Sequence, residues 1–187
     1  MKTLIVDNHT TLLKELCAMA PKPSKVTKFE NLRNTNLDDV GLIILSGASN
    51  FPNVMGHENM LKNEIDLVLN SGKPIIGICY GCELIARAFG AKLEKRPSGN
   101  KKEVSIKIIN EDKIFGGLES FTSYENHSWV VKKILKELEA LAVSDHGIEI
   151  FRHKNRPIYG LQFHPEKVMG ENIGRKVFEK IVGNLSI

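Results

Sequence analysis

Cys79 combines a reactive residue type with a setting that suits a nucleophile. It lies between Gly77 and Gly81, directly after a short apolar, β-branched run, and a segment with apolar residues at helical spacing follows it. This pattern predicts a buried strand, a tight turn and a helix, with the cysteine on the turn. Because a thiol at a helix N-terminus feels the positive end of the helix dipole, we expect its pKa to fall below the usual value of about 8.5.

A cysteine nucleophile needs a base, and a second stretch far downstream offers one. His164 and Glu166 stand two residues apart on either side of Pro165. In an extended segment their side chains leave the same face of the chain. Pro165 biases His164 toward extended backbone angles. The pattern predicts that the imidazole acts as a base and that the carboxylate orients it.

The two stretches together resemble a known family, the class I, triad-type glutamine amidotransferases. They read Gly77-Ile78-Cys79-Tyr80-Gly81 and Gly160-Leu161-Gln162-Phe163-His164-Pro165-Glu166. The resemblance covers most of the chain. It implies that Cys79 attacks the side-chain amide of glutamine, that His164 shuttles the proton and that Glu166 orients His164.

The resemblance also implies an oxyanion hole. The family places a glycine-rich loop after the third strand, and here residues 46–50 read Ser-Gly-Ala-Ser-Asn instead of the usual Ser-Gly-Gly-Pro start. Carried over, the backbone N–H groups of Gly47 and Tyr80 face the developing oxyanion. Without the family, Gly47 fits an ordinary strand-to-loop turn equally well.

Three further residues are substrate-binding candidates by the same resemblance. Glu83 occupies the position of a family glutamine that holds the amino-acid end of the substrate. A carboxylate there would accept from the substrate's ammonium but repel its carboxylate. Ser128 and Trp129 follow His127 as in the His-Ser-Leu of anthranilate-type members, and we expect their backbone to meet glutamine. The simpler interpretations are a first-turn helix acid for Glu83 and a strand start for Ser128 and Trp129.

Other interpretations of the same residues stay open. Cys79 and Cys82 form a C-x-x-C spacing typical of redox sites, although that interpretation leaves His164 and Glu166 unexplained. The altered loop and Glu83 also fit a stand-alone γ-glutamyl hydrolase or a non-catalytic regulatory homologue. We expect no metal and no cofactor, because the sequence lacks a second cysteine or histidine pair with zinc spacing.

The implied partner is a separate, ATP-dependent synthetase, because the sequence ends at Ile187 without a synthetase domain. Tyr80 and the run from Arg152 to Gly160 look most like the glutaminase subunit of GMP synthase. The amidotransferase subunit of anthranilate or aminobenzoate synthase is the alternative within the family.

Composition limits the other partners and the compartment. The net charge of +4 is mild and no dense block of Lys and Arg appears, so we expect neither nucleic acid nor a membrane as a partner. Three cysteines are few and odd in number, which suits a reducing cytoplasm. The histidines other than His127 and His164, His146 among them, are expected at the surface or at caps.

These residues must be positioned by a particular order of elements. Length predicts one domain over residues 1–187, and alternating strands and helices up to about residue 90 predict a doubly wound, mostly parallel α/β sheet. A half-exposed alternation after Gly90 predicts an antiparallel or mixed addition in the second half. The expected strands span 3–6, 25–29, 40–45, 74–78, 103–109, 128–134, 148–153 and 158–163, and the expected helices span 10–20, 58–70, 83–89 and 170–182, the first capped by Thr10 or Thr11.

Overall fold

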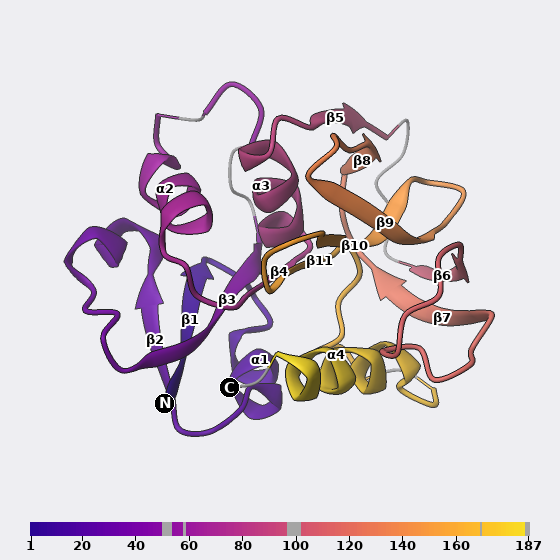
Figure 1. The fold of residues 1–187 in the computed structure, drawn as a ribbon, viewed down its shortest axis with the longest axis horizontal. Helices are drawn as coiled ribbons and strands as arrows, with labels where there is room; N and C mark the ends of the chain where they lie inside the picture. Colours follow the sequence, from indigo (N-terminus) through magenta and orange to yellow (C-terminus); the bar gives the residue numbers. More distant parts are fainter. Residues whose placement is uncertain (50–53, 58, 97–101, 169, 186–187) are drawn as a thin grey trace.

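A nine-stranded sheet forms the centre of the molecule. The structure is a computed structural model, and it describes residues 1–49, 54–57, 59–96, 102–168 and 170–185. The strand order is β2-β1-β3-β4-β11-β10-β9-β6-β7 (Figure 1). A separate antiparallel pair, β5-β8, lies beside this sheet.

The elements alternate in the first half of the chain and become mainly strands in the second. The first half contains β1 (Lys2–Asn8), α1 (Leu13–Met19), β2 (Ser24–Lys28), the 3-10 helix η1 (Phe29–Asn34), β3 (Val40–Ala48), α2 (Lys62–Asn70), β4 (Ile75–Ile78) and α3 (Tyr80–Ala88). The second half contains β5 (Lys92–Lys95), β6 (Lys102–Ile108), β7 (Ser120–Glu125), β8 (Trp129–Lys133), β9 (Leu138–Val143), β10 (Ile148–His153), β11 (Ile158–Leu161) and α4 (Ile173–Asn184).

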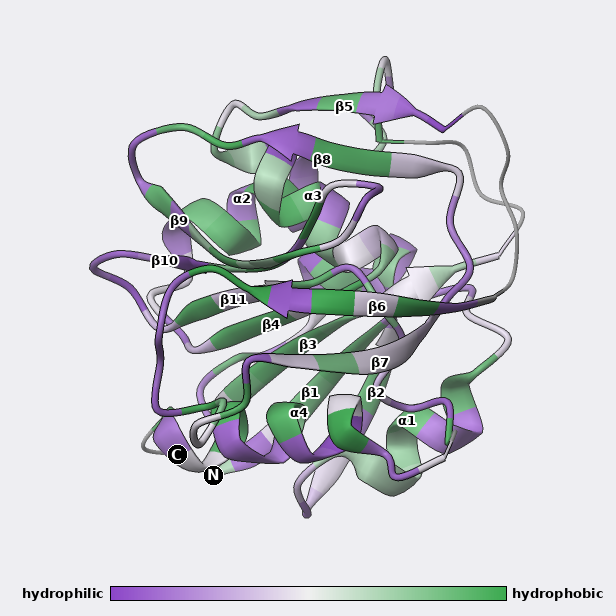
Figure 2. Ribbon diagram, turned by 90° about the vertical axis from the view of Figure 1, so that its right-hand side faces the viewer, coloured by the Kyte–Doolittle hydropathy of each residue, from purple (hydrophilic) through white to green (hydrophobic). Residues whose placement is uncertain are grey.

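Helices cover both faces of the parallel part of the sheet. Apolar side chains of β1, β3 and β4 point alternately to two buried clusters. One cluster packs under α2 and α3, and the other packs under α1 and α4, which Figure 1 shows on the opposite side of the sheet. Figure 2 shows these central strands as almost continuously apolar, as expected for strands buried on both faces. The predicted doubly wound α/β fold is confirmed.

The strand that carries the second predicted motif lies next to the strand that carries the first. β11 inserts between β4 and β10, parallel to β4, with Ile158 opposite Ile75 and Leu161 opposite Ile78. Both strands therefore end at the same edge of the sheet. The remaining strands β10, β9, β6 and β7 pair antiparallel, as the mixed second half predicted.

Several local expectations differ from the structure. β5, β7 and β9 were not predicted, and α3 begins at Tyr80, directly after the cysteine, instead of at Glu83. Leu12 precedes α1 without a side-chain cap, so the predicted threonine cap is wrong; Thr10 Oγ1 instead accepts a hydrogen bond from the Leu12 N–H. The ends of two predicted segments, Asn50 and Glu58, lie outside the described residues.

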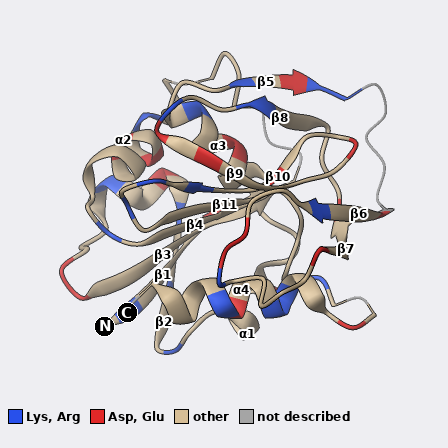
Figure 3. Ribbon diagram, turned by 45° about the vertical axis from the view of Figure 1, so that its right-hand side comes forward, with Lys and Arg blue, Asp and Glu red and all other residues tan. Residues whose placement is uncertain are grey.

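Charged residues of both signs are spread over the helices and strands without a single-sign block (Figure 3). None of the helices in the described ranges combines the length and the apolar character that crossing a membrane requires.

Candidate active site

Cys79 occupies the sharp turn between β4 and α3. Its backbone has φ 50° and ψ −104°, a conformation that L-residues rarely adopt and that surrounding structure must enforce. Its N–H donates to the carbonyl of Leu161, at 2.7 Å, and its own carbonyl accepts from the N–H of Glu83, at 3.0 Å. The turn thus fixes the cysteine against both β11 and the first turn of α3.

The two glycines beside the cysteine allow this turn because each lies against backbone. A Cβ on Gly77 would approach the carbonyl oxygen of Gly81 to 2.4 Å, and a Cβ on Gly81 would approach the carbonyl oxygen of Leu45 to 2.3 Å. Neither contact is possible for a real side chain, so both positions require glycine. The predicted nucleophile elbow is present.

His164 and Glu166 meet beside this elbow. His164 Nδ1 lies 2.8 Å from Glu166 Oε1, and both side chains are almost fully buried. A Cβ on Gly47 would lie 3.1 Å from His164 Cε1 and 3.6 Å from Cys79 Cβ, so the imidazole and the cysteine flank the same glycine. His164 also lines a cavity of about 430 Å³ between β7 and the start of α4, together with Tyr124, Lys167 and Arg175.

Burial and neighbouring charges shift the pKa values of Cys79 and His164 in opposite directions. Burial raises the pKa of the Cys79 thiol, and the neighbouring His164 offsets only part of that effect. The expected lowering of the thiol pKa is therefore wrong, because burial outweighs the effect of His164. Burial alone would lower the pKa of His164, but Cys79, once it is a thiolate, and Glu166 raise it well above its usual value.

The two oxyanion candidates also lie at this edge. Gly47 is near the end of β3, where it lies against Cys79 and His164. Tyr80 is the first residue of α3, where backbone amides point beyond the helix N-terminus. Their part in an oxyanion hole stays a prediction.

The segment 126–129 approaches the cysteine through a residue that was not singled out from sequence. The thiol Sγ lies 4.0 Å from the carbonyl oxygen of Asn126. The predicted Ser128 and Trp129 use their carbonyls within the protein: Ser128 accepts from the N–H of Arg96, at 2.8 Å, and Trp129 accepts from His127 Nδ1, at 2.7 Å. Asn126 stands in the same motif as these two residues, but only the fold shows which carbonyl faces the thiol.

Glu83 lies beneath the elbow and is 4% exposed. Its Oε1 accepts a hydrogen bond from Gln162 Nε2, at 3.1 Å. Burial raises its pKa to about 8, with Gln162 and His164 opposing the shift. At neutral pH the side chain is therefore mainly a neutral acid, so the repulsion expected between Glu83 and a substrate carboxylate is largely absent.

Cys82 belongs to a different environment from Cys79. Its side chain is fully buried in the apolar cluster under α2 and α3, whereas Cys79 contacts the cluster on the other face. Burial raises the pKa of the Cys82 thiol well above its usual value. All three cysteines are free thiols, and Cys82 has the setting of an inert core residue.

A second group of buried polar side chains lies close to segment 126–129. Glu125, His127 and Glu149 are buried, and Arg96 and His146 bond to Glu125. His146, expected at the surface or at a cap, is partly exposed, at 26% of its side chain, and its ring bonds to buried Glu125 and Arg96.

Comparisons with known proteins agree with this geometry. The family described as glutamine amidotransferase class-I matches residues 4–183. A glutamine-hydrolysing GMP synthase subunit from Methanococcus vannielii is 36% identical over 152 residues, covering 77% of this chain and 75% of that protein. The protein of the same description from Pyrococcus furiosus is 35% identical over 182 residues, covering 95% and 84%. A crystal structure from Thermoplasma acidophilum, described as a GMP synthase subunit, superimposes with a TM-score of 0.86 at 27% identity, covering 100% of this chain and 94% of that chain.

Proposed function

The chain belongs to the class I glutamine amidotransferases, and from this premise we propose that it hydrolyses glutamine and delivers the ammonia to a separate synthetase of the GMP synthase type. The observation that carries the proposal is the convergence of Cys79, His164 and Glu166 at one sheet edge, with the cysteine on a strained elbow. We propose that residues 1–187 form one amidotransferase domain, which works in the cytoplasm with an ATP-dependent partner.

We propose that the reaction begins at the thiol. His164 takes the proton from Cys79, and the sulfur attacks the side-chain amide carbon of bound glutamine. The carbonyl oxygen becomes an oxyanion, which accepts from the backbone N–H groups of Gly47 and Tyr80; one such donor is worth roughly 3 kcal/mol of barrier. The C–N bond then breaks, and the leaving nitrogen takes the proton from His164 as ammonia departs.

The second half of the reaction regenerates the enzyme. A water molecule gives a proton to His164 and attacks the thioester carbon. The C–S bond breaks, glutamate leaves, and the thiolate of Cys79 regains the proton. Throughout, the hydrogen bond that His164 Nδ1 donates to Glu166 Oε1 fixes which ring nitrogen faces the sulfur.

The binding of glutamine involves the neighbouring residues. The buried acid of Glu83 presents neutral hydrogen-bonding groups in place of the family's glutamine side chain. The carbonyl of Asn126 borders the thiol, and the backbone of segment 126–129 supplies the remaining contacts with glutamine.

A direct experiment tests the proposal. The purified chain is incubated with glutamine, alone and with a GMP synthase-type synthetase and its substrates, and glutamate is measured. Cys79→Ala should reduce glutamate release to below about one-thousandth, and His164→Ala should come close to this loss. Cys82→Ala is the matched control and should keep most of the activity.

The partner's role is tested by supplying ammonia directly. Saturating ammonia should restore synthesis by the partner in the presence of the Cys79→Ala chain, because only the release of ammonia is lost. An absence of glutamate from the wild-type chain under every pairing, with no thioester trapped on Cys79, would overturn the proposal.

A further inference from the structure

A network of five charged or titratable side chains, four of them buried, lies next to the candidate active site. They come from four parts of the chain: Arg96 after β5, Glu125 and His127 around the end of β7, His146 before β10, and Glu149 within β10. The side chains of Glu125 and Glu149 are fully buried, and Arg96 and His127 are 7% exposed as residues. Burying so many polar groups is costly unless each is paired.

Glu125 is the centre of the network. Its Oε2 lies 3.0 Å from Arg96 Nη1, 3.2 Å from His127 Nε2 and 3.2 Å from His146 Nδ1. Arg96 Nη1 and His127 Nε2 are 3.5 Å apart, the separation of two donors that share one acceptor. This arrangement requires an ionised carboxylate at Glu125.

The partners of each ring determine its protonation. His127 Nδ1 donates to the carbonyl of Trp129 at 2.7 Å, and its Nε2 faces the Glu125 carboxylate, so both ring nitrogens lie against acceptors. His146 Nε2 faces Arg96 Nη2 at 3.0 Å. Because a guanidinium only donates, His146 Nε2 accepts there, and its Nδ1 donates to Glu125.

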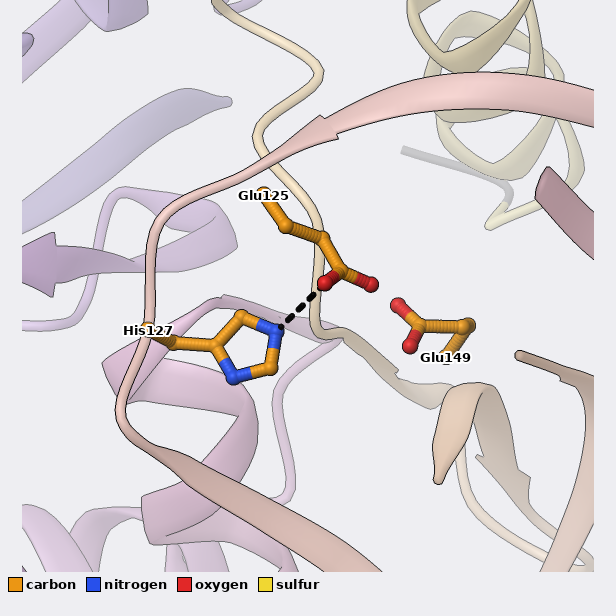
Figure 4. Close-up of side chains that lie close together, drawn as sticks. All are labelled: Glu125, His127 and Glu149. Carbon is orange, nitrogen blue, oxygen red and sulfur yellow. Dashed lines mark ion pairs between the residues drawn. The ribbon is translucent and has the colours of Figure 1, made fainter. Parts of the chain in front are cut away.

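Glu149 faces Glu125 across the cluster (Figure 4). Its Oε1 accepts from Ser144 Oγ at 2.7 Å. Glu149 Oε2 and Glu125 Oε1 are buried and have no other hydrogen-bond partner in the described part of the chain. Two buried carboxyl groups can face each other without strong repulsion when they share one proton. This proton resides on Glu149, because Arg96 and the two histidine rings gather around Glu125.

The pKa shifts agree with this geometry. Burial alone would raise the pKa of Glu125, but hydrogen bonds from His127 and its neighbours lower it to about 2. Burial and the facing Glu125 raise the pKa of Glu149 well above its usual value.

A metal ion is the competing occupant. Single ligand atoms of Glu125, His127 and Glu149 lie within 4.8 Å of one another, which suits a cation in distance. However, the guanidinium of Arg96 and the ring of His127 already pair with Glu125, and a metal would have to displace both. The shared proton fits the donors that are present.

The network fixes the segment that approaches the nucleophile. Glu125 and Asn126 are consecutive, and the Asn126 carbonyl lies 4.0 Å from Cys79 Sγ. His127 holds the carbonyl of Trp129, and the backbone of Arg96 holds that of Ser128. Three carbonyls of segment 126–129 therefore depend on this cluster or border the thiol.

We propose that Glu125 and Glu149 are positioning residues for glutamine recognition: ionised Glu125, with Glu149 as its protonated partner, holds segment 126–129 in register with Cys79. This inference rests on the proposed glutaminase function. The two carboxyl groups lie face to face but carry different charges, so the same substitution should have different effects at the two positions.

The experiment compares Glu125→Gln with Glu149→Gln, and adds Glu149→Ala. A glutamine at 149 can donate to Glu125 and accept from Ser144, as the protonated acid does. A glutamine at 125 removes the carboxylate that pairs with Arg96 and His127. The readouts on Cys79 are the rate of labelling by a glutamine-like chloroketone, the rate with iodoacetamide, and KM and kcat for glutamine.

We expect Glu149→Gln to stay within about twofold of wild type in every readout. Glu125→Gln and Glu149→Ala should slow chloroketone labelling and raise KM by about tenfold, with iodoacetamide labelling nearly unchanged. If Glu125→Gln does not fold, the inference is tested by the other pair: Glu149→Ala should slow chloroketone labelling and raise KM, and Glu149→Gln should restore both to the wild-type values.

Three outcomes would overturn the inference. Equal effects of Glu125→Gln and Glu149→Gln would contradict the assignment of different charges to the two carboxyl groups. Equal slowing of both labelling reagents would indicate a general structural role. Stabilisation of the dialysed wild-type chain by zinc ions, lost in Glu149→Gln, would show a metal site. A wild-type chain that neither reacts with the chloroketone nor hydrolyses glutamine would instead contradict the proposed function, and the melting temperatures of the two glutamine variants would still test the charge assignment.

Discussion

Cys79, the proposed nucleophile, lies in surroundings that favour the protonated thiol until a base removes the proton. Burial raises the pKa of the Cys79 thiol, and His164 is the main group that opposes the rise. A buried neutral thiol is protected from indiscriminate oxidation and alkylation, because the thiolate is the reactive form. The cysteine therefore depends on its histidine for reactivity.

This dependence predicts how alkylation varies with pH. In a Cys17→Ser background, iodoacetamide labelling of Cys79 should rise through a midpoint above the usual thiol pKa of about 8.5. His164→Ala should move the midpoint higher, because the group that lowers the thiol pKa is gone. The rate is followed by mass spectrometry from about pH 6 to about pH 10, a range that spans the usual thiol pKa. A wild-type midpoint clearly below the usual value, or no change in the variant, would contradict the role given to burial.

Glu83 supplies a second prediction at the same scale. Its pKa of about 8 means that it gains a negative charge as the pH rises through that value. If Glu83 contacts the carboxylate end of glutamine, KM should rise several-fold between about pH 7 and about pH 9 in the wild-type chain. In Glu83→Gln, which cannot ionise, KM should stay nearly constant over this range. The same rise in both chains would remove Glu83 from the substrate site.

At the scale of elements, the elbow depends on two glycines, and the cost of replacing one of them can be measured. Gly81→Ala would place a Cβ 2.3 Å from a backbone oxygen of β3, so β3 or α3 must shift and the free energy of unfolding should fall by a few kcal/mol, about the upper range for single substitutions. Gly183→Ala is the matched control. It lies exposed in α4 with nothing near its Cβ, and there alanine should stabilise by up to ~1 kcal/mol. Urea unfolding of both variants decides this, and an unaffected Gly81→Ala would show that the close packing is wrong.

The same elements show what the sequence could and could not predict. Strands β1, β3, β4 and β11 were predicted because each is an apolar run buried on both faces. β7 was not, since its inward positions include the polar Ser123 and Glu125, which weaken the alternation. The early start of α3 also escaped prediction, because Gly81 and the elbow geometry, not an apolar repeat, begin that helix.

The candidate site also contains residues that the sequence could predict and residues that it could not. Cys79, His164 and Glu166 were identified because their motifs are local in sequence, and the structure brings them together. Asn126 and Glu149 carry no such local signal. Their positions depend on the pairing of distant strands, which periodicity along the chain does not specify.

For the whole molecule, buried acids set the dependence of stability on pH. Glu64 of α2 is 1% exposed, and burial raises its pKa from 4.5 to about 7. The folded state then holds a proton that the unfolded chain releases, so stability falls as the pH rises from about 4.5 and levels off above about 7. The loss at this one residue can reach ~3 kcal/mol.

Glu64→Gln should therefore stabilise the protein increasingly as the pH rises. The difference in melting temperature between variant and wild type should grow from about pH 5 to about pH 8. Glu179→Gln, at an exposed position on α4, should show no such trend. A constant difference for Glu64→Gln across this range would mean that Glu64 is not protonated in the folded state.

The placement of β11 in the centre of the sheet has a consequence for synthesis on the ribosome. β4 and its cysteine leave the ribosome first, whereas the strand that must lie beside β4 emerges only after β5 to β10. Until then β4 and β10 each present an open edge, which is prone to pairing with other chains. The nascent chain also carries its thiol without the base that activates it. Under the proposed mechanism the chain is thus chemically silent while it is being made, and the same late strand closes the sheet and completes the candidate active site.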